Sequence, residues 1–357
     1  MKIGILTFWG VPNQGTFAQA YALHHYLQKI CPGYEIYQIA YLHSRHIRFY
    51  EEYREQCDNY QNRLRSDRLF IEAYKSIPHI YLQSEELLEK EEFDLLVLGS
   101  DIIWDYSINV FGDDVHLFGN KMNAKNIISY APSFGTCKAK RPVPEYVKNG
   151  LLRLDKIAVR DTNSADIVEK VTGKRPEVVL DPTWLWDFEC DEALINVNKG
   201  NSYIFIYGEN FEDKFIYRLK KYAKETGKST IALNAYNREF DWCDVVIDSK
   251  DKPPLEIISY FKYAECVATN TFHGMMFGLL FNKKTAYCKS DFVWAKLSSL
   301  LTYLNLDRLY MDSNDVYEMF NYDWNNSGIS EKIDLLREKS KKYLLDIVSE
   351  LTEQKNL

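Results

Sequence analysis

The chain has 357 residues, of which 46% are hydrophobic and 27% are charged, and its formal net charge is −7. This composition is that of a globular protein with enough length for two or three domain-sized units. The negative charge gives no electrostatic support to nonspecific nucleic-acid binding, so we expect no nucleic-acid partner.

Cysteine usage and hydropathy bear on the compartment. Seven scattered cysteines without a C-x-x-C spacing argue against a disulfide framework or a zinc site and favour a reducing environment. No apolar run reaches the roughly 18 residues of a membrane span. The opening MKIGILTFWG is too short for a signal peptide and is typical of a strand that enters a glycine loop. We therefore expect a cytoplasmic protein, with peripheral contact to the cytoplasmic membrane as a further expectation.

The first segment predicts a strand, a glycine-rich turn and a helix. Residues 3–8 are a short apolar strand, the loop 9–15 follows, and residues 16–30 carry apolar side chains at helical spacing. This is the first half of a βαβ unit. The glycine pattern is weak support for a nucleotide site, because no lysine completes a phosphate loop. His24 and His25, on the helix, are predicted to lie on the surface.

A charged segment follows the second predicted strand, at 35–42. Residues 43–92 are charged, aromatic and largely helical, with HSRHIRFYEEYREQ followed by NRLRSDRLF. Such arginines most often belong to a solvated helical face. The functional alternative is a flap that binds an acceptor and meets the membrane.

Four further segments predict parallel strands, at 94–98, 126–130, 156–159 and 177–180. Ligands in parallel sheets lie at the carboxyl ends of strands. Three of these ends carry the polar candidates Ser100, Asp101, Arg160 and Asp181. Structural interpretations stay open, because Asp101 can cap a turn and Asp-Pro is a common turn start.

The second half of the chain repeats the strand–helix alternation after a tryptophan-rich and acidic linker at 184–200. We predict an N-terminal Rossmann-like domain over 1–188, with a helical insert at 43–92, and a C-terminal Rossmann-like domain over 189–357. The last helix, 330–351, has no strand to follow. It is expected to pack back on the N-terminal domain.

Residues 265–288 predict a strand, a polar corner, a short buried helix and another strand. The corner places His273, the only histidine after residue 116, at the N-terminus of that helix. Free backbone N–H groups and the helix dipole favour an anion there. A lone histidine is usually structural, and that interpretation would hold without further support.

Four segments in order resemble the polysaccharide pyruvyl transferase family. They are residues 3–23, the G-S-D-x-x-W at 99–104, the A-V-R-D and L-D-P-T at 158–161 and 180–183, and the T-N-T-F-H-G at 269–274. The resemblance implies a GT-B-like architecture, with two Rossmann-like domains that face a cleft. The first loop departs from the family pattern at Gln14 and at 16–18, which leaves its acceptor preference open.

The resemblance also implies an activity. Such a protein transfers the pyruvyl group of phosphoenolpyruvate to sugar hydroxyls, usually as a ketal, during synthesis of an exopolysaccharide or capsule. The partners are phosphoenolpyruvate and a saccharide acceptor, which can be lipid-linked. No metal and no cofactor are expected, because phosphoenolpyruvate is the donor substrate.

Site roles follow by match to the motifs. His273 would be general acid or phosphate ligand, and Arg160 would hold the donor anion with its planar fork. Asp101 and Asp181 are candidate bases or hydroxyl-binding groups. The remaining substrate-binding candidates are Asn13, Gln14 and Gly15 on the acceptor side, with Ser100, Asn270, Thr271, Gly274 and Lys289.

Two other functions stay open at this point. A GT-B glycosyltransferase that uses a nucleotide sugar would need a similar basic cleft, so fold alone does not separate it from a pyruvyl transferase. A catalytically inert protein that binds glycan or phosphate on the same scaffold is the third possibility.

Overall fold

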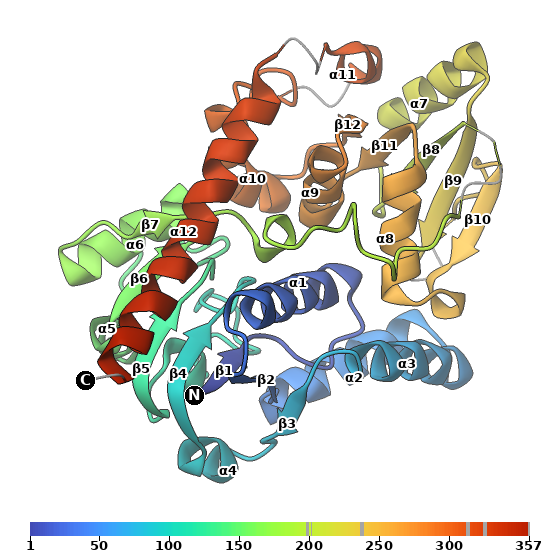
Figure 1. Cartoon of the computed structure of the whole chain (residues 1–357). Helices are drawn as coiled ribbons and strands as arrows, with labels where there is room; N and C mark the ends of the chain where they lie inside the picture. The colour runs from blue at the N-terminus through green and yellow to red at the C-terminus, as the bar shows by residue number, and fades with distance from the viewer. Residues whose placement is uncertain (198–199, 201, 236–238, 312–314, 324–326, 356–357) are drawn as a thin grey trace. The chain divides into compact units, whose positions relative to one another are not determined.

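The computed structural model describes residues 1–197, 200, 202–235, 239–311, 315–323 and 327–355. The chain divides into two compact units (Figure 1). Unit 1 comprises Met1–Glu51, Tyr74–Trp186 and Lys332–Leu357, and unit 2 comprises Glu52–Ala73 and Asp187–Glu331. Each unit has its own parallel sheet, so the predicted class of two Rossmann-like α/β units is confirmed.

Unit 1 contains, within its described residues, a seven-stranded parallel sheet of order β3-β2-β1-β4-β5-β6-β7. Its strands are β1 (Lys2–Leu6), β2 (Glu35–Ala40), β3 (His79–Tyr81), β4 (Glu92–Leu98), β5 (Asn123–Ser129), β6 (Lys156–Val159) and β7 (Glu177–Val178). The first six positions follow the Rossmann order. Leu6 pairs with Leu98, and Leu98 with Ser129, so the carboxyl ends of β1, β4 and β5 meet at one edge.

The helices of unit 1 differ in how their N-termini are capped, and side chains satisfy free backbone N–H groups at some of them. They are α1 (Gln14–Ile30), the first part of α2 (Ser44–Cys57), α4 (Glu85–Lys90), α5 (Glu145–Arg153), α6 (Thr162–Thr172) and α12 (Ile329–Lys355) from residue 332 onward. The Asn13 side chain caps α1 by accepting from the backbone N–H groups of Gly15 and Thr16. Asp161 caps α6 in the same way, and Gly173 ends it in the left-handed conformation.

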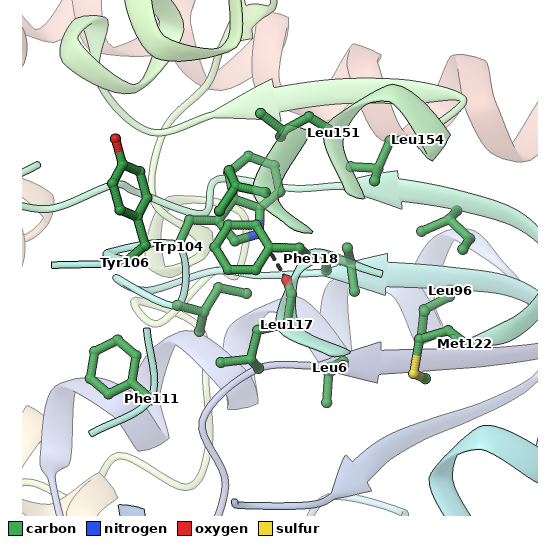
Figure 2. Packing of buried hydrophobic residues seen from close by; sticks show 14 of the residues in the cluster. Leu6, Leu96, Trp104, Tyr106, Phe111, Leu117, Phe118, Met122, Leu151 and Leu154 are labelled. Atoms are coloured by element: carbon green, nitrogen blue, oxygen red, sulfur yellow. Dashed lines mark hydrogen bonds between the residues drawn. The ribbon is translucent and has the colours of Figure 1, made fainter. Parts of the chain in front are cut away.

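Two apolar clusters cover the sheet of unit 1. Around Trp104, the indole Nε1 donates to the carbonyl of Leu117 at 2.8 Å and the ring stacks on Phe118 (Figure 2). In the other cluster, Leu23 of α1 and Leu344 of α12 pack with strand residues such as Ile5. Burial of α12 in this cluster explains why the last helix belongs to unit 1, although the linker lies far before it in the chain.

Unit 2 contains, in its described part, a five-stranded parallel sheet of order β10-β9-β8-β11-β12. Its strands are β8 (Tyr203–Tyr207), β9 (Ser229–Asn234), β10 (Val245–Asp248), β11 (Cys266–Thr269) and β12 (Lys284–Tyr287). Its helices are α3 (Tyr60–Tyr74, to residue 73), α7 (Asp213–Thr226), α8 (Pro254–Tyr263), α9 (Phe272–Leu280), α10 (Asp291–Tyr303) and α11 (Val316–Asn321). The described part of the chain has no helix both long and apolar enough to cross a membrane.

The helical insert differs from its sequence-based assignment to the N-terminal domain, because Glu52–Ala73 falls in unit 2. Two ion pairs join this segment to the rest of unit 2. Lys250, whose side chain is only 3% exposed, pairs with Asp58 at 3.3 Å, and Arg65 pairs with Asp251. These partners lie almost 200 residues apart in sequence, so no local pattern could indicate them.

The predicted surface position of His24 was wrong. Its side chain is buried, and His25 is half-buried. The reason is that α1 is enclosed on nearly all sides: the short 3-10 helix Pro182–Trp184 packs against it, and the Trp186 ring lies 5.3 Å from that of His25. Burial, with a smaller contribution from His25, lowers the pKa of His24 to about 4.

Candidate functional site

The polar candidates of unit 1 lie where parallel strands end. Ser100 and Asp101 follow β4, Arg160 follows β6, and Asp181 follows β7 by three residues. Because these ends share one edge of the sheet, the side chains form a connected network. The structure thus brings together residues that are up to 81 positions apart in the chain.

A buried ion pair forms the centre of this network. Arg160 Nη1 donates to Asp181 Oδ2 at 2.8 Å, and the two side chains are 3% and 0% exposed. Ser100 Oγ lies 3.5 Å from the same carboxylate oxygen. The charge of each partner is compensated by the other, which is the condition for burying either one.

The second oxygen of Asp181 is also bonded. Asp181 Oδ1 accepts from the backbone N–H and the hydroxyl of Thr183, at 3.1 and 2.8 Å. A carboxylate with both oxygens bonded and no exposed surface is held in place. Such a fixed and buried carboxylate is well suited to orient Arg160. It is poorly suited to take a proton from a substrate hydroxyl.

Asp101 has a different environment. Its backbone is left-handed, with φ of 72°, and its side chain is only half-buried. Oδ2 accepts from the Thr16 hydroxyl at 3.1 Å, and Oδ1 accepts from the Ile102 N–H at 2.8 Å. Of the two candidate bases, Asp101 is therefore the more accessible to a substrate.

Gln19 and Thr7 hold the Ser100 peptide from both sides, and sequence analysis missed both. Gln19 Oε1 accepts from the Ser100 N–H at 3.3 Å, while the Thr7 hydroxyl donates to the Ser100 carbonyl at 3.0 Å. Gln19 Nε2 donates to the Thr7 hydroxyl at 3.2 Å. All three residues are buried. One feature of the sequence could have indicated Gln19, namely that a glutamine lies on the apolar face of the first predicted helix.

The acceptor-side candidates occupy the start of α1. Asn13 uses its side-chain oxygen to cap the helix, at 2.9 Å from the Gly15 nitrogen and 3.1 Å from the Thr16 nitrogen. Gln14 and Gly15 are buried in the first turn. Thr16 links this turn to Asp101 through its hydroxyl, so the loop after β1 and the loop after β4 form one structure.

In unit 2, His273 is the second residue of α9 and is half-buried. Thr271 caps the helix by accepting from the Gly274 N–H at 2.9 Å. Thr269, at the end of β11, donates its hydroxyl to the Tyr207 carbonyl at 2.6 Å. These bonds fix the direction in which α9 leaves the sheet, and with it the position of the histidine.

Gly274 is required by close packing of this corner. A Cβ atom at that position would lie 2.1 Å from Thr269 Oγ1 and 2.7 Å from Thr271 Oγ1, closer than any real contact. The glycine of the T-N-T-F-H-G segment therefore lets the helix start directly on the strand end. Its predicted substrate contact remains a prediction.

Asn270 and Lys289 also have partners inside unit 2. The Asn270 amide bonds both the N–H and the carbonyl of Glu209, which braces the loop after β8. Lys289 Nζ lies 4.8 Å from the centre of the Trp294 ring. Because the Cys288 N–H donates to the Thr269 carbonyl at 2.8 Å, Lys289 begins at the same edge as His273.

The predicted site residues thus form two groups. Arg160, Asp181, Ser100 and Asp101 are joined with the 13–16 loop in unit 1, whereas His273, Asn270, Thr271, Gly274 and Lys289 lie at the strand ends of unit 2. The proximity of Arg160 and His273 in one cleft stays a prediction.

One cluster has the residue types of a metal site. Ligand atoms of Glu85, Glu89 and His116 lie within 4.8 Å of one another. Burial alone would lower the pKa of His116, but hydrogen bonds to Asp114 and Glu89 raise it. Lys121 also pairs with Glu89 at 3.2 Å. Glu89 is thus already engaged by Lys121 and by a hydrogen bond to His116, and we assign no metal to the cluster.

Comparison with known proteins gives a family and a fold. A family model described as polysaccharide pyruvyl transferase matches residues 15–291. No curated protein matches the chain. The UDP-GlcNAc 2-epimerase of Methanocaldococcus jannaschii is similar in structure, with 13% identity and a TM-score of 0.53, over 98% of this chain and 99% of its own.

Two further solved structures share this likeness. The UDP-GlcNAc 2-epimerase of Neisseria meningitidis, bound to UDP-GlcNAc, has 10% identity and a TM-score of 0.48, over 95% of this chain and 99% of its own. The wall teichoic acid polymerase TagF has 13% identity and a TM-score of 0.48, over 100% of this chain and 89% of its own. At such identities the likeness concerns the fold alone, and the archaeal epimerase agrees with the GT-B-like class.

Proposed function

The chain belongs to the polysaccharide pyruvyl transferase family, and we propose that it transfers the pyruvyl group of phosphoenolpyruvate to hydroxyl groups of a saccharide. The observation that carries the proposal is the buried Arg160–Asp181 pair within the matched region. It supplies a guanidinium of fixed orientation at the ligand-binding edge of a Rossmann-like sheet.

The reaction sets clear chemical demands. One acceptor hydroxyl adds to C2 of phosphoenolpyruvate, and the methylene carbon gains a proton to become methyl. The C2–O bond to phosphate then breaks, phosphate leaves with the electron pair, and a second hydroxyl closes the ketal. The protein must bind a carboxylate and a phosphate, deliver one proton and accept those of the hydroxyls.

We assign Arg160 to the donor anion. Guanidinium binds carboxylate or phosphate through a planar array of donors. Asp181 is reassigned from candidate base to the residue that orients Arg160, because both its oxygens are bonded and its side chain is fully buried. A preorganised cation loses less side-chain entropy when the donor binds.

We assign His273 to protonation or phosphate binding and Asp101 to the acceptor hydroxyl. Imidazole can exchange a proton near neutral pH, and the first turn of a helix favours an anion. Asp101 is the accessible carboxylate of unit 1, and its contact with Thr16 links it to the 13–16 loop assigned to the acceptor. We place the reaction in the cytoplasmic synthesis of a cell-surface polysaccharide.

The donor separates this proposal from the alternatives. Phosphoenolpyruvate should raise the melting temperature of the protein, because a ligand that binds only the native state at about 100 times its Kd adds roughly 2.7 kcal/mol. UDP-GlcNAc should not. A shift with UDP-GlcNAc alone would favour a glycosyltransferase.

A transfer assay tests the chemistry itself. Incubation with phosphoenolpyruvate and a panel of nitrophenyl hexosides should release inorganic phosphate and add a pyruvyl group to one acceptor, visible by mass spectrometry. The Arg160→Ala variant is the control and should release much less phosphate when phosphoenolpyruvate is well below saturation. Binding of phosphoenolpyruvate without any transfer across a broad acceptor panel would favour an inert binding protein.

A further inference from the structure

Unit 1 carries a groove of about 640 Å³ between α5, α6 and α12. Its floor is apolar and includes Leu151, Leu154, Ile157 and Val168. Leu151 and Leu154 also belong to the core cluster around Trp104, so the floor rests on the interior of the unit (Figure 2).

The groove lies away from the candidate site of this unit. It is lined by Lys156 and Ile157, which begin β6, and by Glu177, which begins β7. Arg160 and Asp181 follow the opposite ends of the same two strands. Neither lines the groove, so its occupant would not compete with substrate for these residues.

The rim of the groove is cationic in an acidic protein. Its cations are Lys156, Lys174, Arg175, Lys339 and Lys342, against the carboxylates of Asp155, Glu177 and Asp346. The lining therefore has five cations against three carboxylates, whereas the whole chain has a net charge of −7. A small excess of positive charge lines the groove of an otherwise acidic protein.

The rim cations are available to another anion. Lys339 pairs with Glu177 at 2.8 Å and Lys342 with Asp346 at 2.9 Å. Lys156 pairs with Glu350, and Arg175 with Asp166 and Glu169. At least 39% of each of these four cationic side chains is nevertheless exposed. Such exposed pairs contribute little and are screened by salt. These cations can exchange their partners for a denser array of anions.

An exposed leucine completes the surface. Leu152 lines the groove and has 63% of its surface exposed to solvent. Lysine and arginine around an exposed aliphatic side chain suit the boundary of a bilayer, where phosphates and acyl chains occur together.

We propose that this groove docks unit 1 on a bilayer that contains anionic phospholipid. The rim cations bind the lipid phosphates, Leu152 enters the interface, and the apolar floor receives an acyl segment. The charged 43–92 segment offers less, because the side chains of Arg54 and Arg63 are only 15% and 19% exposed and are held by Asp67 and Glu55. The inference goes beyond the proposed reaction and does not depend on it.

Vesicle co-sedimentation of the full chain tests the proposal. Vesicles with phosphatidylglycerol should bind the protein, vesicles of phosphatidylcholine alone should not, and added salt should weaken binding. Each basic residue near an anionic surface contributes about five-fold in affinity. The triple variant Lys174→Ala, Lys339→Ala, Lys342→Ala should therefore lose about 100-fold.

A matched triple variant in unit 2 tests whether vesicle binding depends on the groove lysines in particular. Lys214→Ala, Lys220→Ala and Lys224→Ala remove the same charge from exposed positions on α7 of unit 2. This variant should bind as the unmodified protein does. Leu152→Ser should weaken binding, whereas Leu87→Ser, at another exposed leucine, should not.

Several outcomes would overturn the proposal. They are absence of vesicle binding, equal binding to phosphatidylcholine, or equal losses in the two triple variants. A melting shift with inorganic phosphate, lost in the groove variant but without vesicle binding, would instead assign the groove to a free phosphate compound. Circular dichroism confirms that each variant is folded.

Discussion

Arg160 and Asp181 form an ion pair, 2.8 Å between Nη1 and Oδ2, in which neither side chain exposes more than 3% of its surface. They belong to separate strand ends, and 21 residues separate them. A buried pair of this kind contributes little net stability, but losing one partner leaves an uncompensated charge. The pair therefore links the stability of unit 1 to the geometry of its candidate site.

Removing the carboxylate should destabilise unit 1. Asp181→Asn keeps the shape but leaves the Arg160 charge unpaired, so the free energy of unfolding should fall by about 3 kcal/mol. Urea unfolding measures this difference. Asp101→Asn, a change at the half-buried carboxylate of the same edge, should cost less than about 1 kcal/mol. Equal losses of stability in the two variants would mean that the buried Asp181 is no more important for folding than the half-buried Asp101.

Replacing the guanidinium should weaken donor binding. Arg160→Ala should reduce the affinity for phosphoenolpyruvate by about 30-fold or more, because a charge-assisted hydrogen bond contributes roughly 2–3 kcal/mol. Arg160→Lys should recover only part, since an ammonium does not reproduce the planar fork. Calorimetric titration provides the Kd values. Unchanged affinity in a folded Arg160→Ala protein would remove Arg160 from the donor site.

Substitution of His273 separates proton transfer from phosphate binding. If the imidazole delivers a proton, His273→Ala should lower kcat by about 10²–10⁴-fold with a smaller change in donor Kd. His273→Gln can keep a hydrogen bond to phosphate but cannot deliver the proton. Steady-state kinetics of both variants decide the role. Near-normal turnover in His273→Gln would leave His273 as a phosphate ligand.

Gln19 should act as a positioning residue for the Asp101 loop. Gln19→Leu leaves the buried Ser100 N–H unpaired and should lower kcat by about 10- to 100-fold, because a small displacement of a reacting group is costly. The donor Kd should change little. Gln38→Leu is the matched control, because Gln38 is equally buried, on β2.

The comparison between these glutamines is decisive. Comparable activity losses in Gln38→Leu and Gln19→Leu would mean that buried-glutamine packing, rather than support of the Ser100 peptide, produces the effect. Gln19→Glu retains an acceptor for the Ser100 N–H, so it should recover part of kcat. The kcat values, measured with the protein shown to be folded, provide the test.

The buried His24 should make the stability of the folded protein sensitive to acid. Burial lowers its pKa from 6.5 to about 4, so the unfolded chain binds the proton more readily. Its stabilising contribution is complete above pH 6.5 and is lost as pH falls towards 4. When the pH is lowered from about 7.5 to about 5, protonation linked to His24 should reduce the free energy of unfolding by about 2 kcal/mol.

Urea unfolding at the two pH values measures the decrease in the free energy of unfolding. In the His24→Leu variant this decrease should be smaller by about 2 kcal/mol. The buried His46, whose pKa is also lowered to about 4, should contribute a separate loss that persists in His24→Leu. An unchanged pH dependence in His24→Leu would contradict the assignment.

Local patterns were sufficient for the elements and for the position of many candidate residues. Strand 156–159 was predicted with the bounds that the structure has, because an apolar run acts within a few residues. The polar ends at Ser100, Asp101 and Arg160 were visible for the same reason. The two Rossmann-like units followed from the repeated strand–helix alternation.

Tertiary structure alone decided which of these residues meet. The pairing of Arg160 with Asp181, the bond from Ser100 to Gln19, and the assignment of 52–73 to unit 2 all join distant segments. The burial of His24 depends on elements that cover α1 from elsewhere in the chain. Caps, turns and periodicity are determined by neighbours in sequence, whereas ion pairing and burial depend on the sheet order that brings remote strand ends to one edge.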